Sequence, residues 1–413
     1  MLEKCIANCL LCGKCASRNF IILDDFPVDN GDFTASELRQ GYGIAIDIGT
    51  TTVVMALIDL IPAKIIARHS FLNPQRVYGA DVISRIHAAN EGHLTDLHRL
   101  ITESVSSGIN ALLQKRSVNN IDDIVIAGNT TMIHLLLGQP CKDLGVFPFK
   151  TNVLIKEKYT YSEIFPGLQS DNFDNCKVKL IPWFAAFVGG DITAGLLFIM
   201  RRRSSHLNES SFLLIDLGTN GEIALLKNGK LTVTSCAAGP AFENSDKGNA
   251  VGASGVIHEL AQLIRGGMLD ETGVIKKDIS GGAACGTPGF FSQKNIRSLQ
   301  LAKSAVRTGV EILLDTACMT YNDIDAVYLS GGIGQAVDVS DAAEIGLIPA
   351  ELTGKTKAAG NSSLGGAVCA LLSPVSVVND INALLSDFSE INLANHPRFN
   401  ELFAENMLFN VGE

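Results

Sequence analysis

The chain has 413 residues, of which 46% are hydrophobic and 18% are charged, so it is long enough for two or three domains and is not a disordered protein. Its formal net charge of −10, with the basic residues scattered, argues against nucleic acid or an anionic membrane surface as the main partner. No apolar run reaches the ~20 residues that a membrane helix needs and no signal-peptide pattern is present, so we expect a cytoplasmic protein.

The first residues carry four cysteines in one tight run, spaced C-x3-C-x2-C-x2-C. Thiolates packed this densely can hold one compact centre, and soft sulfur ligands favour an iron–sulfur cluster or zinc. Zinc usually takes its ligands as two separated pairs, so the run favours an iron–sulfur cluster of the 4Fe-4S type, with zinc or free thiols as alternatives. We therefore expect a metal-binding segment at 1–16 and an acidic linker at 17–40. The candidate metal ligands are Cys5, Cys9, Cys12 and Cys15.

Residues 41–60 have the pattern of a strand, a tight turn and a second strand. Ile44–Ile48 and Val53–Leu60 are apolar and β-rich, and Gly49 between them is expected to adopt a positive φ. Such a turn points successive N–H groups and hydroxyls into one concavity, which suits a phosphate. A carboxylate at the end of the first strand can hold the water shell of Mg²⁺. These candidate ligands are Asp47, Gly49, Thr50 and Thr51.

A third strand is expected at Lys64–Ser70, and the segment NPQRVYGADVISRI follows it. Its polar side chains come close after the turn in the sequence. They are either ligand contacts or the solvated start of a helix. These side chains are Arg76, Tyr78, Asp81 and Arg85.

Two further loops of this half follow expected strands. In IDDIVIAGNTTMIHLLLG, Gly128, Asn129 and Thr130 lie where a strand becomes a helix, a usual place for ligand contact. The alternative is that Thr130 or Thr131 is simply the N-cap of the helix. In IPWFAAFVGGDITAGLL we expect a strand that ends at the Gly-Gly pair and a helix that begins at Asp191. Asp191 is either a cap without chemistry or a carboxylate that orients Mg²⁺ or water.

The segment SFLLIDLGTNGEIALLKNGKL, at Ser211–Leu231, repeats the first strand-turn-strand pattern. The D-x-G-T core recurs at one fixed offset, and each copy begins a run of strands followed by helical sequence. This repeat predicts two duplicated subdomains, 41–208 and 209–413, whose facing hairpins clamp the phosphates of a nucleotide. The alternative is two unrelated hairpins. The second set of candidate ligands is Asp216, Gly218, Thr219 and Asn220.

Two later loops add candidates. In SCAAGPAFENSDKG, Glu243 follows a Gly-Pro loop and is a candidate water-positioning or Mg²⁺-shell carboxylate, while Cys236 is expected to be structural. In IDAVYLSGGIGQA a strand again runs into glycines and a helix, and such glycines let a flat ring approach the backbone. These glycines are Gly331, Gly332 and Gly334. Amphipathic helices are expected at Leu94–Leu113, Ile296–Thr316 and 396–409.

In this order, the motifs D-I-G-T-T-T, A-G-N-T-T, D-L-G-T-N-G-E, S-G-G-I-G and G-N-S-S-L-G-G-A resemble those of the actin-like ATPase superfamily, which includes acetate and sugar kinases, actin and related chaperones. Six longer segments resemble the ATP-dependent reductive activators of corrinoid proteins more closely still. These segments are NPQRVYGADVISRI, AGNTTMIHLLLG, FVGGDITAGLL, IDLGTNGEIAL, SCAAGPAFE and HPRFNELF. The resemblance covers roughly residues 41–413.

The resemblance implies an α/β fold of duplicated actin-like (ribonuclease H-like) ATPase subdomains around a nucleotide cleft. The short cysteine-rich metal-binding segment precedes these subdomains in the sequence. It implies an enzyme that hydrolyses ATP to drive an electron from an iron–sulfur cluster to a corrinoid protein, reducing Co(II) to Co(I). The two sets of turn residues would hold the phosphates and Mg²⁺, the later glycines would pack on the adenosine, and the four cysteines would hold the cluster. In that family a two-iron ferredoxin domain and a linker domain usually precede the ATPase part, whereas residues 1–16 here carry the cysteine run.

The implied partners are a corrinoid protein or another low-potential redox client, and a reductase or ferredoxin that donates electrons. A homodimer is compatible with the sequence, and no nucleic acid or membrane is expected. Two other functions stay open at this point. One is a small-molecule kinase of the same fold, which would give the four cysteines no role. The other is a nucleotide-gated interaction protein whose cysteines bind zinc structurally.

Overall fold

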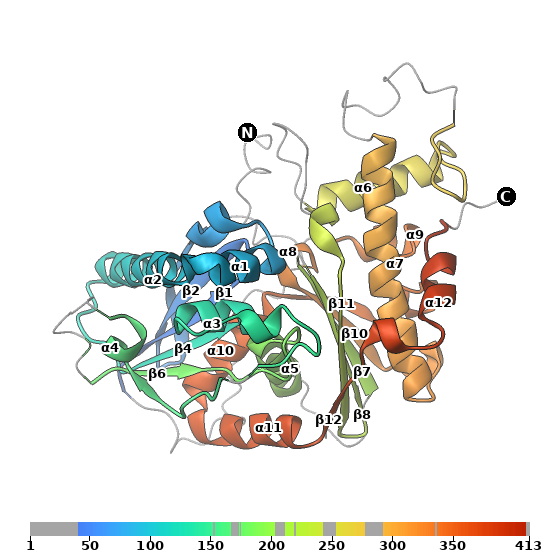
Figure 1. Ribbon diagram of the computed structural model, residues 1–413. Helices are drawn as coiled ribbons and strands as arrows, with labels where there is room; N and C mark the ends of the chain where they lie inside the picture. Colours follow the sequence, from blue (N-terminus) through green and yellow to red (C-terminus); the bar gives the residue numbers. More distant parts are fainter. Residues whose placement is uncertain are drawn as a thin grey trace, which may run out of the picture. The chain divides into compact units, whose positions relative to one another are not determined.

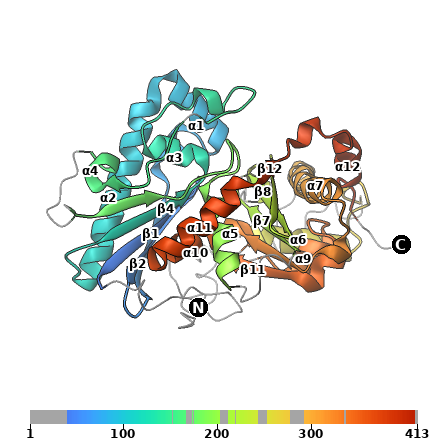
Figure 2. The same cartoon turned by 90° about the horizontal axis from the view of Figure 1, so that it is seen from below.

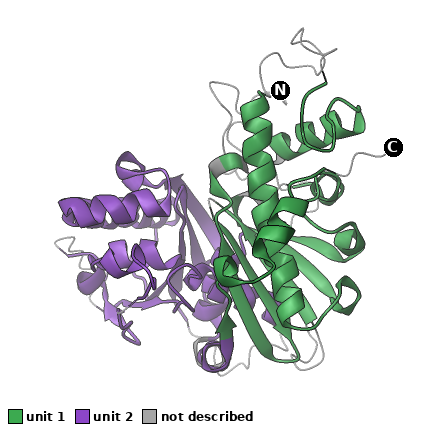
Figure 3. Cartoon of the chain, turned by 45° about the vertical axis from the view of Figure 1, so that its right-hand side comes forward, with its two compact units in different colours: residues 1–20, 205–360, 389–413 green, residues 21–204, 361–388 purple. Residues whose placement is uncertain are grey.

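A computed structural model describes residues 40–151, 153–166, 173, 175–202, 211–218, 220–242, 253–276, 292–334 and 337–409 (Figure 1). The described residues form two compact α/β units, coloured separately in Figure 3. Unit 2 contains the described residues up to 202 together with 361–388, and unit 1 contains 211–360 and 389–409. In the described part of the chain, no helix is long and apolar enough to cross a membrane.

Unit 2 is built on a six-stranded sheet with the order β3-β2-β1-β4-β6-β5. β1 pairs antiparallel with β2 and parallel with β4, which in turn pairs parallel with β6. The carboxyl ends of β1, β4 and β6 therefore lie at the same edge of the sheet. The strands are β1 (Tyr42–Ile48), β2 (Thr52–Asp59), β3 (Lys64–Leu72), β4 (Asp123–Gly128), β5 (Tyr159–Thr160) and β6 (Lys177–Leu180).

Alternation along β1 gives the sheet two different faces. Ile44, Ile46 and Ile48 are completely buried in the core that includes α2, whereas the opposite face packs on α10. Figure 2 shows β1 and β4 between α3 on one side and α10 on the other. The helices of unit 2 are η3 (Pro74–Tyr78), α1 (Val82–Ala88), η4 (Ala89–His93), α2 (Leu94–Arg116), α3 (Thr130–Leu136), η5 (Lys142–Leu144), α4 (Tyr161–Ile164), α5 (Gly190–Arg202), α10 (Ser362–Leu372) and α11 (Pro374–Ser386).

Unit 1 repeats this topology. Its sheet has the order β11-β10-β7-β8-β9-β12, in which β7, β8 and β9 are antiparallel while β7, β10 and β11 are parallel. Five strands of each sheet correspond in order and direction, as the sequence repeat predicts, while the sixth strand lies at the opposite edge: β5 beside β6, but β12 beside β9. The strands are β7 (Ser211–Leu217), β8 (Gly221–Lys227), β9 (Lys230–Cys236), β10 (Ala326–Ser330), β11 (Thr356–Gly360) and β12 (Phe388–Glu390).

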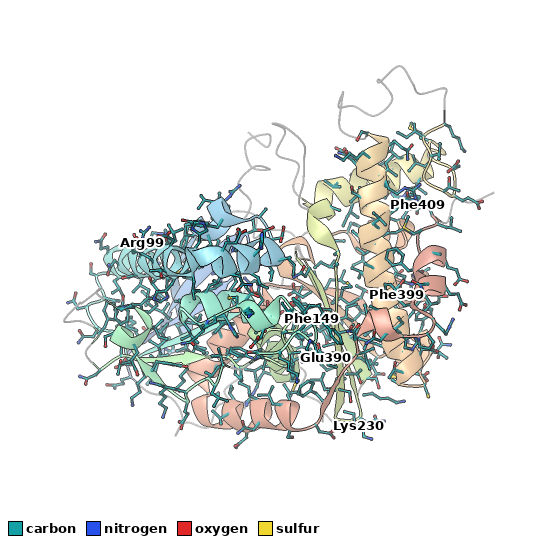
Figure 4. The ribbon with its side chains drawn as sticks, viewed as in Figure 1. Arg99, Phe149, Lys230, Glu390, Phe399 and Phe409 are labelled. Atoms are coloured by element: carbon teal, nitrogen blue, oxygen red, sulfur yellow. The ribbon has the colours of Figure 1, made fainter. Side chains whose placement is uncertain are left out.

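The long helix α7 packs on β8 and β9, and α12 packs on α7. Phe399 and Phe409, both labelled in Figure 4, pack in this core. Buried polar side chains of α7 also fix the last described residues, since Lys303 Nζ donates to the Leu408 carbonyl at 2.5 Å. The helices of unit 1 are η8 (Gly239–Phe242), α6 (Ala253–Arg265), α7 (Gln293–Thr316), η10 (Tyr321–Asp323), α8 (Gly331–Gly334), α9 (Val339–Glu344), η11 (Ala350–Lys355), η12 (Leu393–Asn395) and α12 (Phe399–Glu405).

Two expected boundaries are wrong. The strand before the Gly-Gly pair ends at Leu180, and residues 181–189 form a loop in which Ala185 and Val188 make one isolated bridge. The C-terminal helix spans only Phe399–Glu405 rather than the whole tail. In both places an apolar pattern continued past the end of the element, because loop residues pack into the same cores.

Close packing of α10 on α5 depends on a residue without a side chain. A Cβ at Gly366 would lie 2.0 Å from the Ala194 carbonyl oxygen, which is backbone and cannot rotate away. We expect Gly366→Ala to lower the free energy of unfolding by about 1–3 kcal/mol, as overpacked sites do. Urea unfolding followed by far-UV circular dichroism measures this change.

Gly354→Ala is the matched control, because a Cβ at Gly354 meets no atom within 4 Å. This control should change the free energy of unfolding by less than about 0.5 kcal/mol. Equal unfolding midpoints for the two variants would show that α10 can move away from α5 at little cost.

Candidate functional site

The turn between β1 and β2 is closed by a hydrogen bond from the Gly49 N–H to the Thr52 carbonyl at 3.1 Å. Gly49 does not have the positive φ that we expected, so that prediction is wrong. Glycine is needed there for a different reason, since a Cβ would lie 2.7 Å from the Thr52 carbonyl oxygen. The tightness of the turn, and not a left-handed backbone, excludes a side chain at this position.

Three successive carbonyls of the turn are held by groups from one neighbouring segment. Asn73 Nδ2 donates to the Gly49 carbonyl at 2.9 Å, and the Asn73 N–H donates to the Thr51 carbonyl at 2.9 Å. The Arg85 guanidinium donates to the Thr50 carbonyl at 2.5 Å. Asn73 and Arg85 are completely buried, so the motif NPQRVYGADVISRI supports the turn from inside the unit.

This arrangement decides between the two interpretations of the polar side chains in that motif. Arg85 is not at a solvated helix start, whereas Asp81 is the N-cap of α1 and accepts from the Ser84 N–H at 2.8 Å. Arg76 is exposed, and the Tyr78 hydroxyl donates to Asp96 at 3.2 Å. Asn73 was not among our candidates, although its place just before a proline at the start of the motif is a usable signal.

The Asp47 carboxylate accepts two hydrogen bonds from the start of α10. Asn361 Nδ2 donates to Oδ2 at 2.7 Å, and the Ser363 hydroxyl donates to Oδ1 at 2.8 Å. Burial, the larger effect, raises the pKa of Asp47, and these two hydrogen bonds act in the opposite direction. Neither donor was predicted from the sequence, because both lie more than 300 residues after Asp47.

Asn129 and Asp191 lie close to the same turn. The N-cap of α3 is Asn129 and not Thr130 or Thr131, the alternative that the sequence left open. Asn129 Nδ2 donates to the Thr50 hydroxyl at 3.1 Å. Asp191 accepts from the Ile192 N–H at 2.9 Å in the first turn of α5. A Cβ built on Gly189 would lie 2.4 Å from the Asn129 Cα and 2.5 Å from Asp191 Oδ1. The candidates of unit 2 therefore gather at the edge where β1, β4 and β6 end.

Unit 1 presents a second carboxylate at the equivalent place. Asp216 Oδ2 accepts a hydrogen bond from the Ser330 hydroxyl at 2.5 Å, and the Gly218 N–H donates to the Asn220 carbonyl at 3.1 Å. Gly331 follows Ser330 with a φ of +84°, and a Cβ there would lie 2.5 Å from Asp216 Oδ1. The turn that carries Gly331, Gly332 and Gly334 is therefore adjacent to the Asp216 carboxylate.

Glu222 is a further acidic residue of this site that was not predicted from the sequence. It is directly opposite Asp216 in the β7–β8 pair, so the two side chains share one face of the sheet. Glu222 is only 6% exposed, and its charge adds to the effect of burial in raising the pKa of Cys236 to about 12. The letters D-L-G-T-N-G-E contain this glutamate, but only the register of the hairpin places it beside the aspartate.

Six of the predicted site residues lie outside the described part of the chain, so their predictions remain untested. Within the described residues, no group of three or more His, Cys, Asp or Glu side chains is arranged to hold a metal ion by itself. The six residues are Cys5, Cys9, Cys12, Cys15, Thr219 and Glu243.

The residues that are described fit a magnesium-bound nucleotide phosphate. Carboxylate and hydroxyl oxygens are the donors that Mg²⁺ accepts, usually with several waters retained and with phosphate oxygens completing its shell. Each unit offers a carboxylate at the end of its first strand and a tight turn directly after it.

Family comparisons match almost the whole chain. Residues 42–203 match the model described as the RACo middle region. Residues 210–253 and 244–412 match the model described as the C-terminal domain of RACo, the ASKHA domain.

Individual relatives agree with these models. The chain is 31% identical to the corrinoid activation enzyme RamQ of Eubacterium limosum, over 92% of this chain and 72% of that protein. It is 23% identical to the Co(II) methylated amine-specific corrinoid protein reductase of Methanosarcina barkeri, over 75% of this chain and 66% of that protein. A solved reductive activator for a corrinoid, iron–sulfur protein superposes with a TM-score of 0.79 and 28% identity, covering 92% of this chain and 67% of that one.

The described cysteines differ in exposure, which predicts their reactivity. Burial raises the pKa of the thiols of Cys141, Cys176 and Cys236 to about 12, whereas Cys318 is exposed. Because the thiolate is the nucleophile, iodoacetamide at pH 8 should alkylate Cys318 at least ~100-fold faster than the three buried thiols. Peptide mass spectrometry over a time course measures the four rates.

Unfolding in urea is the control for this measurement and should bring the four rates together. Rapid alkylation of Cys236 in the folded protein would show that β9 opens readily beside Asp216 and Glu222.

Proposed function

The chain belongs to the family of ATP-dependent reductive activators of corrinoid proteins, and we propose that it hydrolyses ATP to drive one electron from its own iron–sulfur cluster to a corrinoid protein. The observation that carries this proposal is the pair of equivalent sites, each with a carboxylate at the end of its first strand followed by a tight turn. A corrinoid activation enzyme aligns with 92% of this chain, which carries both sites.

We assign the phosphate groups of ATP to the two turns. In unit 2, Gly49, Thr50 and Thr51 would face the terminal phosphates, with Asn129 orienting the Thr50 hydroxyl through its hydrogen bond. In unit 1, Gly218, Thr219 and Asn220 would take the equivalent role, and Gly331, Gly332 and Gly334 would pack on the adenosine.

The carboxylates Asp47 and Asp216 would hold waters of the Mg²⁺ shell, and bound Mg²⁺ would neutralise charge on the phosphates. Asp191 and Glu243 are the proposed carboxylates for positioning the attacking water. Asn361, Ser363 and Ser330 keep the two aspartates in fixed rotamers through hydrogen bonds to their oxygens. Positioning and electrostatics are thus the main contributions of the chain to hydrolysis.

Water attacks the terminal phosphate of ATP and gives ADP and inorganic phosphate. Cys5, Cys9, Cys12 and Cys15 would hold the iron–sulfur cluster. The cluster would supply the one electron that reduces Co(II) of the corrinoid protein to Co(I), and a reductase or ferredoxin would supply that electron to the cluster. We place the whole reaction in the cytoplasm, and 4Fe-4S is the cluster type that the cysteine spacing favours.

ATP can act here only through differential binding. Closure on ATP favours one state of the activator–corrinoid pair over another, and the free energy of hydrolysis resets the pair. For one electron, a tenfold change in equilibrium corresponds to about 59 mV. The difference in binding free energy between the two states therefore sets the reduction-potential gap that the electron transfer can overcome.

The nucleotide assignment predicts the effect of removing either carboxylate. Asp47→Asn and Asp216→Asn should each lower the rate of ATP hydrolysis roughly 100-fold or more, because several kcal/mol of metal-assisted charge stabilisation depend on the Mg²⁺ shell. Release of inorganic phosphate at saturating Mg²⁺ measures the rate.

Glu351→Gln, at an exposed position of η11, is the control and should keep the wild-type rate. Unchanged hydrolysis in the Asp47→Asn, Asp216→Asn double variant would overturn the assignment.

The cluster assignment predicts a separate loss. After anaerobic purification the protein should contain about four irons and four sulfides per chain, as a 4Fe-4S centre requires, and should give an electron paramagnetic resonance signal after dithionite reduction. The double variant Cys9→Ser, Cys12→Ser should lose this iron and should no longer reduce the Co(II) form of the corrinoid protein, while ATP hydrolysis continues.

Cys318→Ser is the matched control, because it removes an exposed cysteine outside the run and should leave the iron content unchanged. Stoichiometric zinc without iron in the wild-type protein would overturn the redox proposal and would favour a zinc-stabilised, nucleotide-gated interaction protein.

A further inference from the structure

Arg85 is a buried cation directly behind the turn of unit 2. Its side chain comes from α1 and is completely buried. Besides the bond to the Thr50 carbonyl at 2.5 Å, Nε donates to the Gly79 carbonyl at 3.0 Å and one terminal nitrogen donates to Met132 Sδ at 3.2 Å. The planar fork of the guanidinium thus ties the turn to Gly79, at the end of η3, and to α3.

Burying this charge is costly unless another group compensates it. Burial lowers the pKa of Arg85 to about 10, so the side chain still carries its proton at neutral pH. None of its three acceptors is a carboxylate, and no carboxylate of the described residues forms an ion pair with it. Asp81 is near enough to favour the charged form, Arg76 opposes it, and both Asp81 oxygens are already bonded to Ser84.

A neutral side chain would suffice if support of the turn were the only role. Asn73 shows this, because its uncharged amide holds the neighbouring Gly49 carbonyl equally well at 2.9 Å. The choice of a cation at the next carbonyl therefore calls for a negative charge on the other side of the peptide.

The geometry of the turn indicates where that charge would lie. In a trans peptide the N–H of the following residue points opposite to the carbonyl. Asn73 holds the Gly49 carbonyl from inside the unit, so the Thr50 N–H of the same peptide points away from Asn73. Backbone N–H groups that face outward at a tight turn can bind an anion.

We propose that Arg85 is a positioning residue for the terminal phosphates of ATP. It holds the Thr50 carbonyl in place, and its buried charge attracts the anion from behind the turn. This inference rests on the proposed function, because it takes the ATP phosphates to bind at the turn.

Nucleotides with different numbers of phosphates separate this role from a purely structural one. In Arg85→Gln, ATP should bind roughly 10- to 100-fold more weakly, the effect of losing a hydrogen bond to a charged group, with a smaller loss for ADP and almost none for AMP. Titration calorimetry with each nucleotide gives the dissociation constants. Arg85→Lys keeps the charge without the fork and should recover part of the ATP affinity.

Arg99→Gln is the matched control. Arg99, labelled in Figure 4, lies exposed on α2 with Glu103 as its partner at 3.1 Å, and its loss should leave all three affinities unchanged. If Arg85→Gln does not fold, as judged by circular dichroism, the test passes to Arg85→Lys, which should show the same graded loss in milder form.

Two outcomes would overturn the inference while leaving the proposed function intact. One is wild-type ATP affinity in a folded Arg85 variant, and the other is an equal loss for ATP, ADP and AMP, which indicates general destabilisation. Absence of ATP binding in the wild-type protein would instead contradict the proposed function itself.

Discussion

The hydrogen bonds between Asp47 and the start of α10 are the interaction on which the organisation of unit 2 depends. A carboxylate at the end of a buried strand must be compensated, and here Asn361 and Ser363 provide two donors. Both belong to the first residues of the chain after it leaves β11 of unit 1. The Asp47 carboxylate is therefore held by residues that come more than 300 positions later in the chain.

The two equivalent sites are stabilised in different ways. In unit 2 the turn is supported by Asn73 and Arg85, and Asp47 is bonded to a helix start. In unit 1, Asp216 is bonded to Ser330 at the end of the neighbouring strand, and Glu222 shares its face of the sheet. A common topology has thus kept the position of the carboxylate while the groups around it have diverged.

Local sequence patterns were enough to predict the repeated strand-turn-strand units and most strands, because alternation of apolar residues and Gly-Thr turns are short-range signals. They also indicated Asp47, Asp216 and Asn129. They could not indicate Asn361, Ser363 or Glu222, since those positions depend on chain crossing and on hairpin register. Gly49 shows a third case, in which the residue was chosen correctly for a wrong reason: close approach to Thr52, and not φ, requires glycine.

The division of unit 2 between two distant stretches of sequence has a consequence for synthesis. β1, β2 and β4 leave the ribosome early, but α10 covers their second face and is made only after nearly all of unit 1. Until then the nascent sheet has an uncovered apolar face, and Asp47 lacks both of its donors. A ribosome that stalls before residue 361 would therefore leave a chain in which Asp47 lacks its donors and one face of the sheet is exposed, and exposed apolar surface of this kind promotes aggregation.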